Sequence, residues 1–227
     1  MTYNEITEGR FLRRPNRFIA DVEINGEGIR VHVKNTGRCR ELLVPGARVL
    51  LTKSGNPKRK TPYDLVAVYK GSRLINMDSY APNIVFGEYL RSGALGFVPD
   101  FVKPECTHGD SRFDFYFEVG DRRIFAEIKG VTLESGGVVR FPDAPTERGR
   151  KHLRGLARCV DEGYEAWAVF IVQMENVLYF EPNCATDPEF AEALRDAEKS
   201  GVRILSYDCK VRENSLNIGN PVEIRLG

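Results

Sequence analysis

The sequence predicts an α+β protein of two domains, a small N-terminal β-barrel followed by a mixed α/β domain. Residues 1–80 contain short β-rich runs separated by glycine, proline and asparagine clusters, whereas helical patterns begin only after Asp78. The charge changes at the same place, because residues 1–80 carry 15 Lys and Arg against 8 Asp and Glu, and residues 81–227 carry 18 against 24. We therefore place the domain boundary between residues 80 and 81. A basic first domain suits a polyanionic partner.

The first domain is expected to hold five strands and no helix. Each expected strand is rich in β-branched and aromatic residues: residues 17–24, 29–34, 47–53, 64–69 and 73–77. Five short strands with basic loops are typical of an OB-type barrel, a common nucleic-acid scaffold. An SH3-like barrel is the alternative on the strand pattern alone.

The second domain is expected to begin with a helix and continue as α/β. The expected elements follow in this order: helix 83–92, strands 112–119, 123–131 and 138–141, helix 146–162, strand 166–172, helix 187–199 and strand 202–207. Gly120-Asp121 reads as the turn of a hairpin, and Thr146 can cap the helix that follows it. The apolar run 166–172 is typical of a strand buried on both faces.

Composition narrows the class of protein. The chain has 227 residues, 42% of them hydrophobic, and it contains no apolar run near the roughly 18 residues that a membrane span needs. Its beginning does not read as a signal peptide. Five cysteines without a Cys-x-x-Cys pair predict neither a disulfide framework nor a zinc ribbon. We expect a soluble cytoplasmic protein with no membrane partner.

The expected hairpin carries the strongest chemical signal. Alternate residues of a strand share a face, so Glu127 and Lys129 point the same way, and antiparallel pairing brings Asp114 beside them. Two carboxylates suit Mg²⁺ or Mn²⁺, and a lysine can orient the attacking water at a phosphate. The arrangement and the element order resemble the PD-(D/E)xK nuclease superfamily. Glu88, on the preceding helix, is a candidate outer metal ligand. A solvated, salt-bridged hairpin face is the alternative.

Candidate nucleic-acid contacts form four groups of charged residues: Arg13, Arg14 and Arg17; Lys34, Asn35, Arg38 and Arg40; Lys58, Arg59 and Lys60; and Glu147, Arg148, Lys151 and His152. The first group is interleaved with Phe11 and Phe18, which suits base stacking if they are not barrel core. In the second group, backbone amides near Gly37 are expected to hold a phosphate. The fourth group is otherwise a solvated helix face, with His152 at the helix edge.

Long motifs along the whole chain resemble the sugar fermentation stimulation protein A family. They include RFLRRPNRFIADVEING, NTGR, KRKTPYDL, SRFDFYF, EIKGVTL, FPDAPTERGRKHL and GVRILSYD. The resemblance implies an OB-fold followed by a PD-(D/E)xK-like domain, DNA binding and a role in regulating sugar-metabolism genes. It also implies a metal site at Asp114, Glu127 and Lys129. Cys39 and Pro145 depart from the family's common methionine and valine, but neither change removes a charged group.

Together these patterns predict a DNA-binding protein with a nuclease-type site that depends on Mg²⁺ or Mn²⁺. A DNA-binding regulator that does not cleave is the main alternative, and a carbohydrate-binding OB module is a third. RNA in place of DNA, and a homodimer in place of a monomer, are left open at this point.

Overall fold

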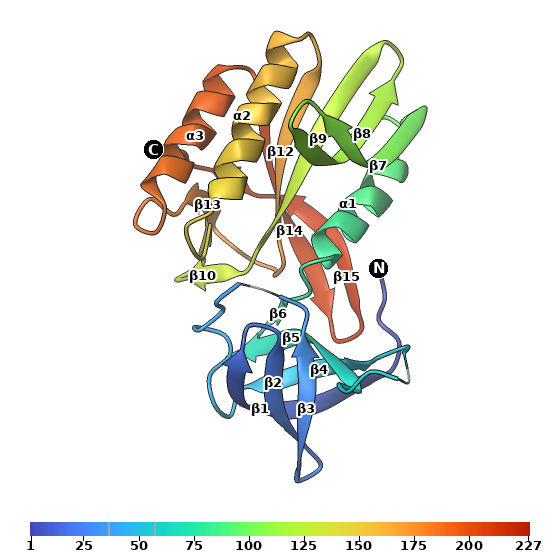
Figure 1. The fold of residues 1–227 in the computed structure, drawn as a ribbon, viewed down its shortest axis with the longest axis vertical. Helices are drawn as coiled ribbons and strands as arrows, with labels where there is room; N and C mark the ends of the chain where they lie inside the picture. The colour runs from blue at the N-terminus through green and yellow to red at the C-terminus, as the bar shows by residue number, and fades with distance from the viewer. Residues whose placement is uncertain (36, 57) are drawn as a thin grey trace.

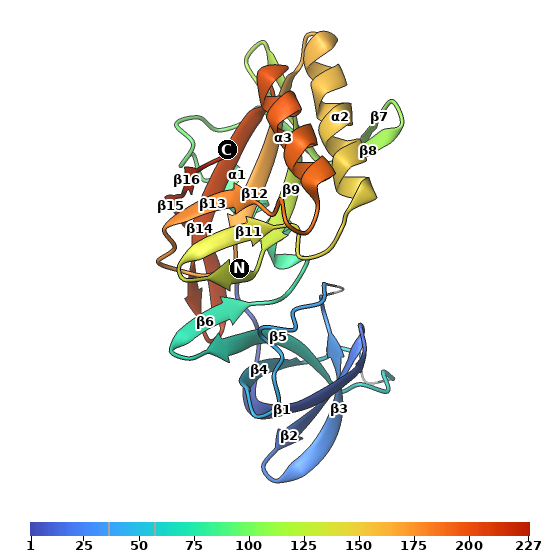
Figure 2. The same cartoon turned by 90° about the vertical axis from the view of Figure 1, so that its left-hand side faces the viewer.

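The computed structural model describes residues 1–35, 37–56 and 58–227. The β-barrel lies at one end of the molecule and the α/β domain at the other, with helix α1 (Ala81–Arg91) beginning at the junction (Figures 1 and 2). No helix in these three ranges is long and apolar enough to span a membrane.

The first domain is a closed barrel of five strands, as expected. Its strands are β1 (Ile6–Asn16), β2 (Ile19–Ile24), β3 (Glu27–Val33), β4 (Arg48–Lys53) and β5 (Tyr63–Lys70). They pair in the order β3-β2-β1-β4-β5, and a parallel pairing of β3 with β5 closes the ring. Closure leaves no free edge in the ring and encloses an apolar interior.

The membership of the barrel differs from the expectation. Strand β1 was not predicted, because register shifts after Phe11 and after Arg13 interrupt its two-residue period and Leu12, an apolar residue, lies on the exposed face. The last predicted strand corresponds to β6 (Arg73–Asn76), which pairs with β5 outside the ring. Five barrel strands were therefore predicted correctly in number, but the predicted set contained β6 in place of β1.

The α/β domain is built on a six-stranded mixed sheet in the order β15-β14-β12-β9-β8-β7. These strands are β7 (Phe101–His108), β8 (Ser111–Val119), β9 (Arg122–Val131), β12 (Glu165–Val172), β14 (Arg203–Arg212) and β15 (Ser215–Pro221). β9, β12 and β14 are parallel, whereas β7, β8 and β9 form an antiparallel meander. Helix α1 packs on one face, and helices α2 (Glu147–Asp161) and α3 (Pro188–Lys199) cover the other.

The predicted third strand of the main sheet is wrong in its place. Residues 138–141 do form a strand, β11 (Val138–Phe141), but it belongs to a separate four-stranded sheet with β10 (Leu133–Ser135), β13 (Tyr179–Pro182) and β16 (Glu223–Ile224). The third strand of the meander is β7, which comes before the hairpin in the sequence. Pro104 lies within β7, and an edge strand tolerates a proline because one of its sides needs no ladder hydrogen bonds.

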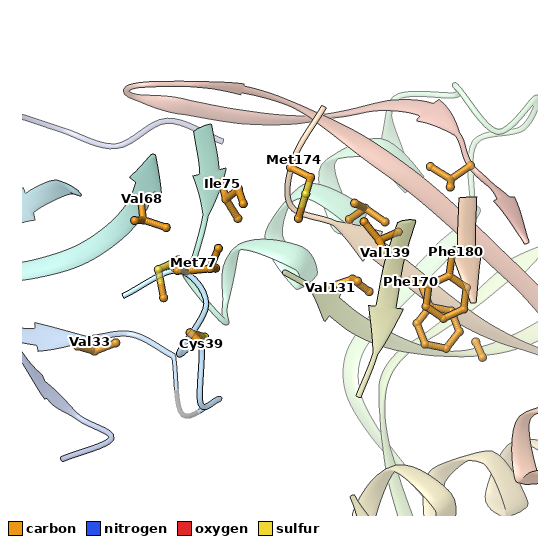
Figure 3. Close-up of a cluster of buried hydrophobic side chains, with 14 of the residues drawn as sticks. Val33, Cys39, Val68, Ile75, Met77, Val131, Val139, Phe170, Met174 and Phe180 are labelled. Carbon is orange, nitrogen blue, oxygen red and sulfur yellow. The ribbon is translucent and has the colours of Figure 1, made fainter. Parts of the chain in front are cut away.

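The two domains share one apolar cluster. Ile75 and Met77 from the end of the first domain pack in the same cluster as Val131 and Met174 from the second, as Figure 3 shows. A buried polar contact reinforces it, because the side-chain amide of Gln173 donates to Asn76 Oδ1 at 2.7 Å and to the carbonyl of Asp78 at 3.0 Å. Buried hydrogen bonds of this kind require one relative placement of the partners. The barrel is therefore held in a defined position beside strand β9.

Candidate active site

The residues predicted to carry chemistry converge where strands β8 and β9 separate. Regular pairing of the two strands ends at Phe115 and Ala126. Beyond that point the Asp114 side chain takes the place of the ladder, and its Oδ2 accepts a hydrogen bond from the Ile128 amide at 2.7 Å. The polar side chains of the site therefore lie at the open end of the hairpin, away from its turn.

Asp114 is held from two sides. Besides the Ile128 amide, the side-chain amide of Asn83 on α1 donates to Asp114 Oδ1 at 2.9 Å. Burial raises the pKa of Asp114 above its ordinary value, and the neighbouring Glu127 carboxylate raises it further. A cation between the two carboxylates would remove this repulsion. Asn83 was not predicted from the sequence, since a polar residue in the first turn of a helix is usually solvated.

Glu127 is the most buried charged group of the site, with 4% of its surface exposed. Its Oε1 accepts a hydrogen bond from Lys129 Nζ at 2.5 Å and a second from Nδ1 of His152. Burial by itself would raise the pKa of Glu127, but the His152 hydrogen bond and the Lys129 charge hold that pKa below its ordinary value. Its other oxygen, Oε2, is buried and has no hydrogen-bond partner within the described part of the chain.

His152 belongs to this site rather than to the exposed helix edge where sequence reasoning placed it. It is buried, and its Nε2 faces Arg148 Nε at 3.5 Å. Helix α2 comes close enough because Gly155 packs on β8, where a Cβ atom would lie 2.7 Å from Ser111 Oγ. The available signal was spacing, because His152 is four residues before the buried Leu156 and so lies on the apolar face.

Glu88 does not join this pair of carboxylates. Its side chain is exposed and accepts an ion pair from the Met1 amine at 2.6 Å. No group of three His, Cys, Asp or Glu side chains within residues 1–35, 37–56 and 58–227 is arranged to hold a metal ion. Asp114 and Glu127 are thus the two predicted carboxylates of this site that could hold a metal ion.

Several backbone groups of the loop after β3 are hydrogen-bonded within the protein. The Arg14 guanidinium donates to the carbonyl oxygens of Arg17, Asn35, Gly37 and Arg38 at 2.6–2.8 Å. The Gly37 amide donates to Asn35 Oδ1, and the Arg38 amide to Asp143 Oδ2. The expectation that these two amides hold a phosphate is therefore wrong, and Arg14 organises the loop. Thr36 lies outside the described residues.

Other predicted nucleic-acid contacts divide into ion-paired and free cations. Several are paired with carboxylates: Arg13 with Asp21, Lys34 with Asp78, Arg59 with Asp64, and Lys151 with Asp110. Other cations have no carboxylate partner among the described residues and are exposed: Arg17, Arg38, Arg40, Lys58 and Lys60. Glu147 is exposed at the start of α2. Phe11 is barrel core, whereas Phe18 is exposed.

A cleft of about 390 Å³ lies between the domains. Its wall includes Asn35 and Arg38 from the barrel and Thr146 from the cap of α2. It also includes Gly130, the residue after Lys129 in strand β9. Gly37 lets the barrel loop approach closely, because a Cβ atom there would lie 2.7 Å from Asp143 Oδ2. Two motifs far apart in the sequence, NTGR and FPDAPT, thus form the two sides of one cleft.

Comparisons with known proteins cover the whole chain. A family model described as the SfsA N-terminal OB domain matches residues 12–77, and one described as the sugar fermentation stimulation protein RE domain matches residues 80–215. A sugar fermentation stimulation protein homolog from Clostridium beijerinckii is 52% identical over 226 residues, with 100% of both chains covered. Another from Desulfitobacterium hafniense is 56% identical over 226 residues, covering 100% of this chain and 99% of that one.

A solved structure agrees with the fold. SfsA of Pyrococcus furiosus in complex with Ca²⁺ superposes with a TM-score of 0.90 at 28% identity, covering 99% of this chain and 98% of that chain. The OB barrel expected from the sequence is confirmed by the matching domain model and by the closed ring of β1–β5. By its fold, its two domain matches and its close relatives, the chain belongs to the sugar fermentation stimulation protein family.

Proposed function

We propose that this protein binds DNA and hydrolyses phosphodiester bonds with Mg²⁺ or Mn²⁺ held by Asp114 and Glu127. The observation that carries the proposal is Glu127 Oε2, a buried carboxylate oxygen without a partner among the described residues. Buried polar atoms are seldom left unpaired, and an unpaired one indicates a functional or ligand-binding role. The Glu127 carboxylate is near enough to Asp114 to raise the pKa of that residue, which burial raises as well.

The donor set fits a hard divalent cation. Carboxylate oxygens are the ligands that Mg²⁺ prefers, and such sites keep several positions for water and substrate phosphate. Two carboxylates without a third ligand agree with that open coordination. The Pyrococcus furiosus relative was solved in complex with Ca²⁺, which is also an oxygen-binding cation. When bound, the ion lowers the pKa of a coordinated water and stabilises charge on the phosphate.

The side chains of the site then have separate roles. Lys129 Nζ lies 2.5 Å from Glu127 Oε1, where it is placed to orient a water or to stabilise negative charge on a phosphate. His152 is a positioning residue, because its Nδ1–H holds Oε1 and leaves Oε2 directed elsewhere. Asn83 and the Ile128 amide hold Asp114 in the same way. The element order around this site, α1, three antiparallel strands, α2 and a parallel strand, supports a PD-(D/E)xK-like assignment.

A DNA-binding regulator that does not cleave is the second candidate, and one observation favours it. The Lys129 ammonium already neutralises Glu127 through a direct ion pair that needs no metal. A closed pair of this kind is also what a structural, catalytically silent hairpin would contain. The two candidates differ in whether Lys129 affects a chemical step.

The deciding experiment compares binding and cleavage in the same Lys129→Ala variant. Labelled single- and double-stranded DNA are bound at equilibrium in Ca²⁺ and then incubated with Mg²⁺, Mn²⁺ or EDTA under single-turnover conditions. We expect cleavage to fall by about 10²–10³ while affinity changes much less, because one electrostatic catalyst is removed from the reacting phosphate. Lys103→Ala, on edge strand β7, is the matched control for loss of one positive charge.

The outcome separates the two candidates. Parent protein that binds DNA tightly but cleaves no substrate with any metal would overturn the nuclease and leave the regulator. Equal loss of binding and cleavage in Lys129→Ala would make Lys129 a phosphate anchor.

A further inference from the structure

An exposed aromatic residue precedes the helix that contacts the candidate site. Tyr80 comes immediately before α1, and 69% of its surface is exposed. Its backbone is fixed, because its amide donates to Asp78 Oδ1 at 3.0 Å. Ile84, four residues later on the same helix face, is also exposed. The rest of the protein therefore leaves both side chains largely exposed.

Tyr80 is within one helical turn of a residue that contacts the candidate site. Asn83, three residues after Tyr80, is the residue that hydrogen-bonds Asp114. Ser79, the residue before Tyr80, lines the cleft between the domains together with Gly130. In the chain, Tyr80 therefore lies between a residue of the cleft wall, Ser79, and a residue that holds Asp114, Asn83.

A second exposed aromatic residue belongs to the barrel and is hydrogen-bonded to the end of strand β3. Phe18 is 48% exposed, and its carbonyl accepts a hydrogen bond from the Val33 amide. The carbonyl of the next residue, Lys34, accepts a hydrogen bond from the Ser79 amide. The end of β3 is thus hydrogen-bonded both to Phe18 and to the residue before Tyr80. A cation accompanies each ring: Arg17 lies 5.4 Å from the Phe18 centroid and Lys34 Nζ lies 5.7 Å from that of Tyr80.

The exposed arginines of the barrel suit a nucleic-acid backbone. Arg17, Arg38 and Arg40 are exposed and have no carboxylate partner within the described ranges. Lys34 differs, because Asp78 neutralises it at 2.5 Å, so its main effect is to hold the Tyr80 ring. Aromatic platforms alternating with free arginines are the pattern by which proteins bind single strands.

We infer that the DNA entering this site is single-stranded, with one base stacked on Tyr80 and its backbone following the cleft past Arg38. The inference rests on the proposed function for the identity of the site. Bases in a duplex are stacked on one another, so only an unpaired base has a free face for Tyr80.

The test measures binding of a fluorescent single-stranded DNA of about 15 nucleotides, and of the duplex of the same sequence, in EDTA. Tyr80→Ala should weaken single-strand binding by about 5- to 100-fold and leave duplex binding unchanged, because stacking of a base on an aromatic ring is lost. Tyr80→Phe keeps the ring and should bind like the parent. The dependence of affinity on salt should be unaltered in Tyr80→Ala, because stacking neutralises no phosphate.

Phe101→Ala is the matched control, since Phe101 is likewise an exposed aromatic residue but lies on edge strand β7. The inference is overturned if Tyr80→Ala binds the single strand as the parent does, or if single-strand and duplex affinities fall equally. It is also overturned if Tyr80→Phe loses as much as Tyr80→Ala. Because no metal is present, these results are independent of cleavage. Single-strand binding through Tyr80 without cleavage in Mg²⁺ or Mn²⁺ would remove the nuclease and leave this inference standing.

Discussion

We expect Asp114→Asn to be at least as stable as the parent protein without metal, and less stable than the parent when a divalent metal is added. In the structure Asp114 Oδ2 accepts from the Ile128 amide and Oδ1 from Asn83. An asparagine keeps both contacts if its oxygen accepts from Ile128 and the Asn83 amide turns over so that its oxygen accepts instead. The variant therefore loses a charge without losing its place in the fold.

Without metal, the charge of Asp114 opposes folding. Burial and the neighbouring Glu127 raise its pKa in the folded protein. A group with a raised folded pKa contributes stability below its unfolded pKa and loses that contribution as the pH rises through the folded value. Each unit of such a shift is worth about 1.4 kcal/mol. In EDTA at pH 7, Asp114→Asn should therefore be at least as stable as the parent, and this difference should disappear in acid.

With metal, the order reverses. A ligand present at about 100 times its Kd stabilises the folded state by about 2.7 kcal/mol, which for a chain of this size is roughly 5–11 °C in Tm. The parent should show this rise in Mn²⁺ and Asp114→Asn should show little of it, as measured by differential scanning fluorimetry. Asp110→Asn is the control, because Asp110 is exposed and pairs with Lys151 and Arg158. If Asp114→Asn gains as much as the parent from Mn²⁺, the metal is not bound by this carboxylate.

Three further outcomes follow from the contacts. His152→Leu removes the donor to Glu127 Oε1 and should weaken Mn²⁺ binding, measured as the rise in Tm during a Mn²⁺ titration. In His152→Asn the Nδ2 atom takes the place of Nδ1, so this variant should keep most of the Mn²⁺ affinity. Arg38→Ala combined with Arg40→Ala should weaken DNA binding and lower the slope of log affinity against log salt by up to about two, and an unchanged slope would exclude this loop from the interface. Arg14→Ala should lower Tm by several degrees more than Arg17→Ala does. The reason is that Arg14 donates to four carbonyl oxygens, whereas the Arg17 side chain is exposed. Equal losses of Tm would show that the loop does not depend on Arg14.

The sequence by itself determined the features that depend on local periodicity. The two-residue alternation of β9 places Glu127 and Lys129 on one face, and the turn at Gly120-Asp121 pairs β9 with β8. The cap of α2 at Thr146 was likewise readable, since its hydroxyl accepts from the Gly149 amide at 3.1 Å. Such features need only neighbours within a few residues of the chain.

Only the tertiary structure decided which side chains are free to act. From the sequence, Arg14 and Lys34 were predicted to be available to DNA. In the structure Arg14 donates to backbone carbonyl oxygens, and Lys34 is paired with Asp78, 44 residues away. His152 read as a surface residue, but the approach of α2 to the sheet brings it to Glu127, 25 residues away. A side chain's partner is set by which distant segments pack together, and the periodicity of a single segment carries no information about that choice.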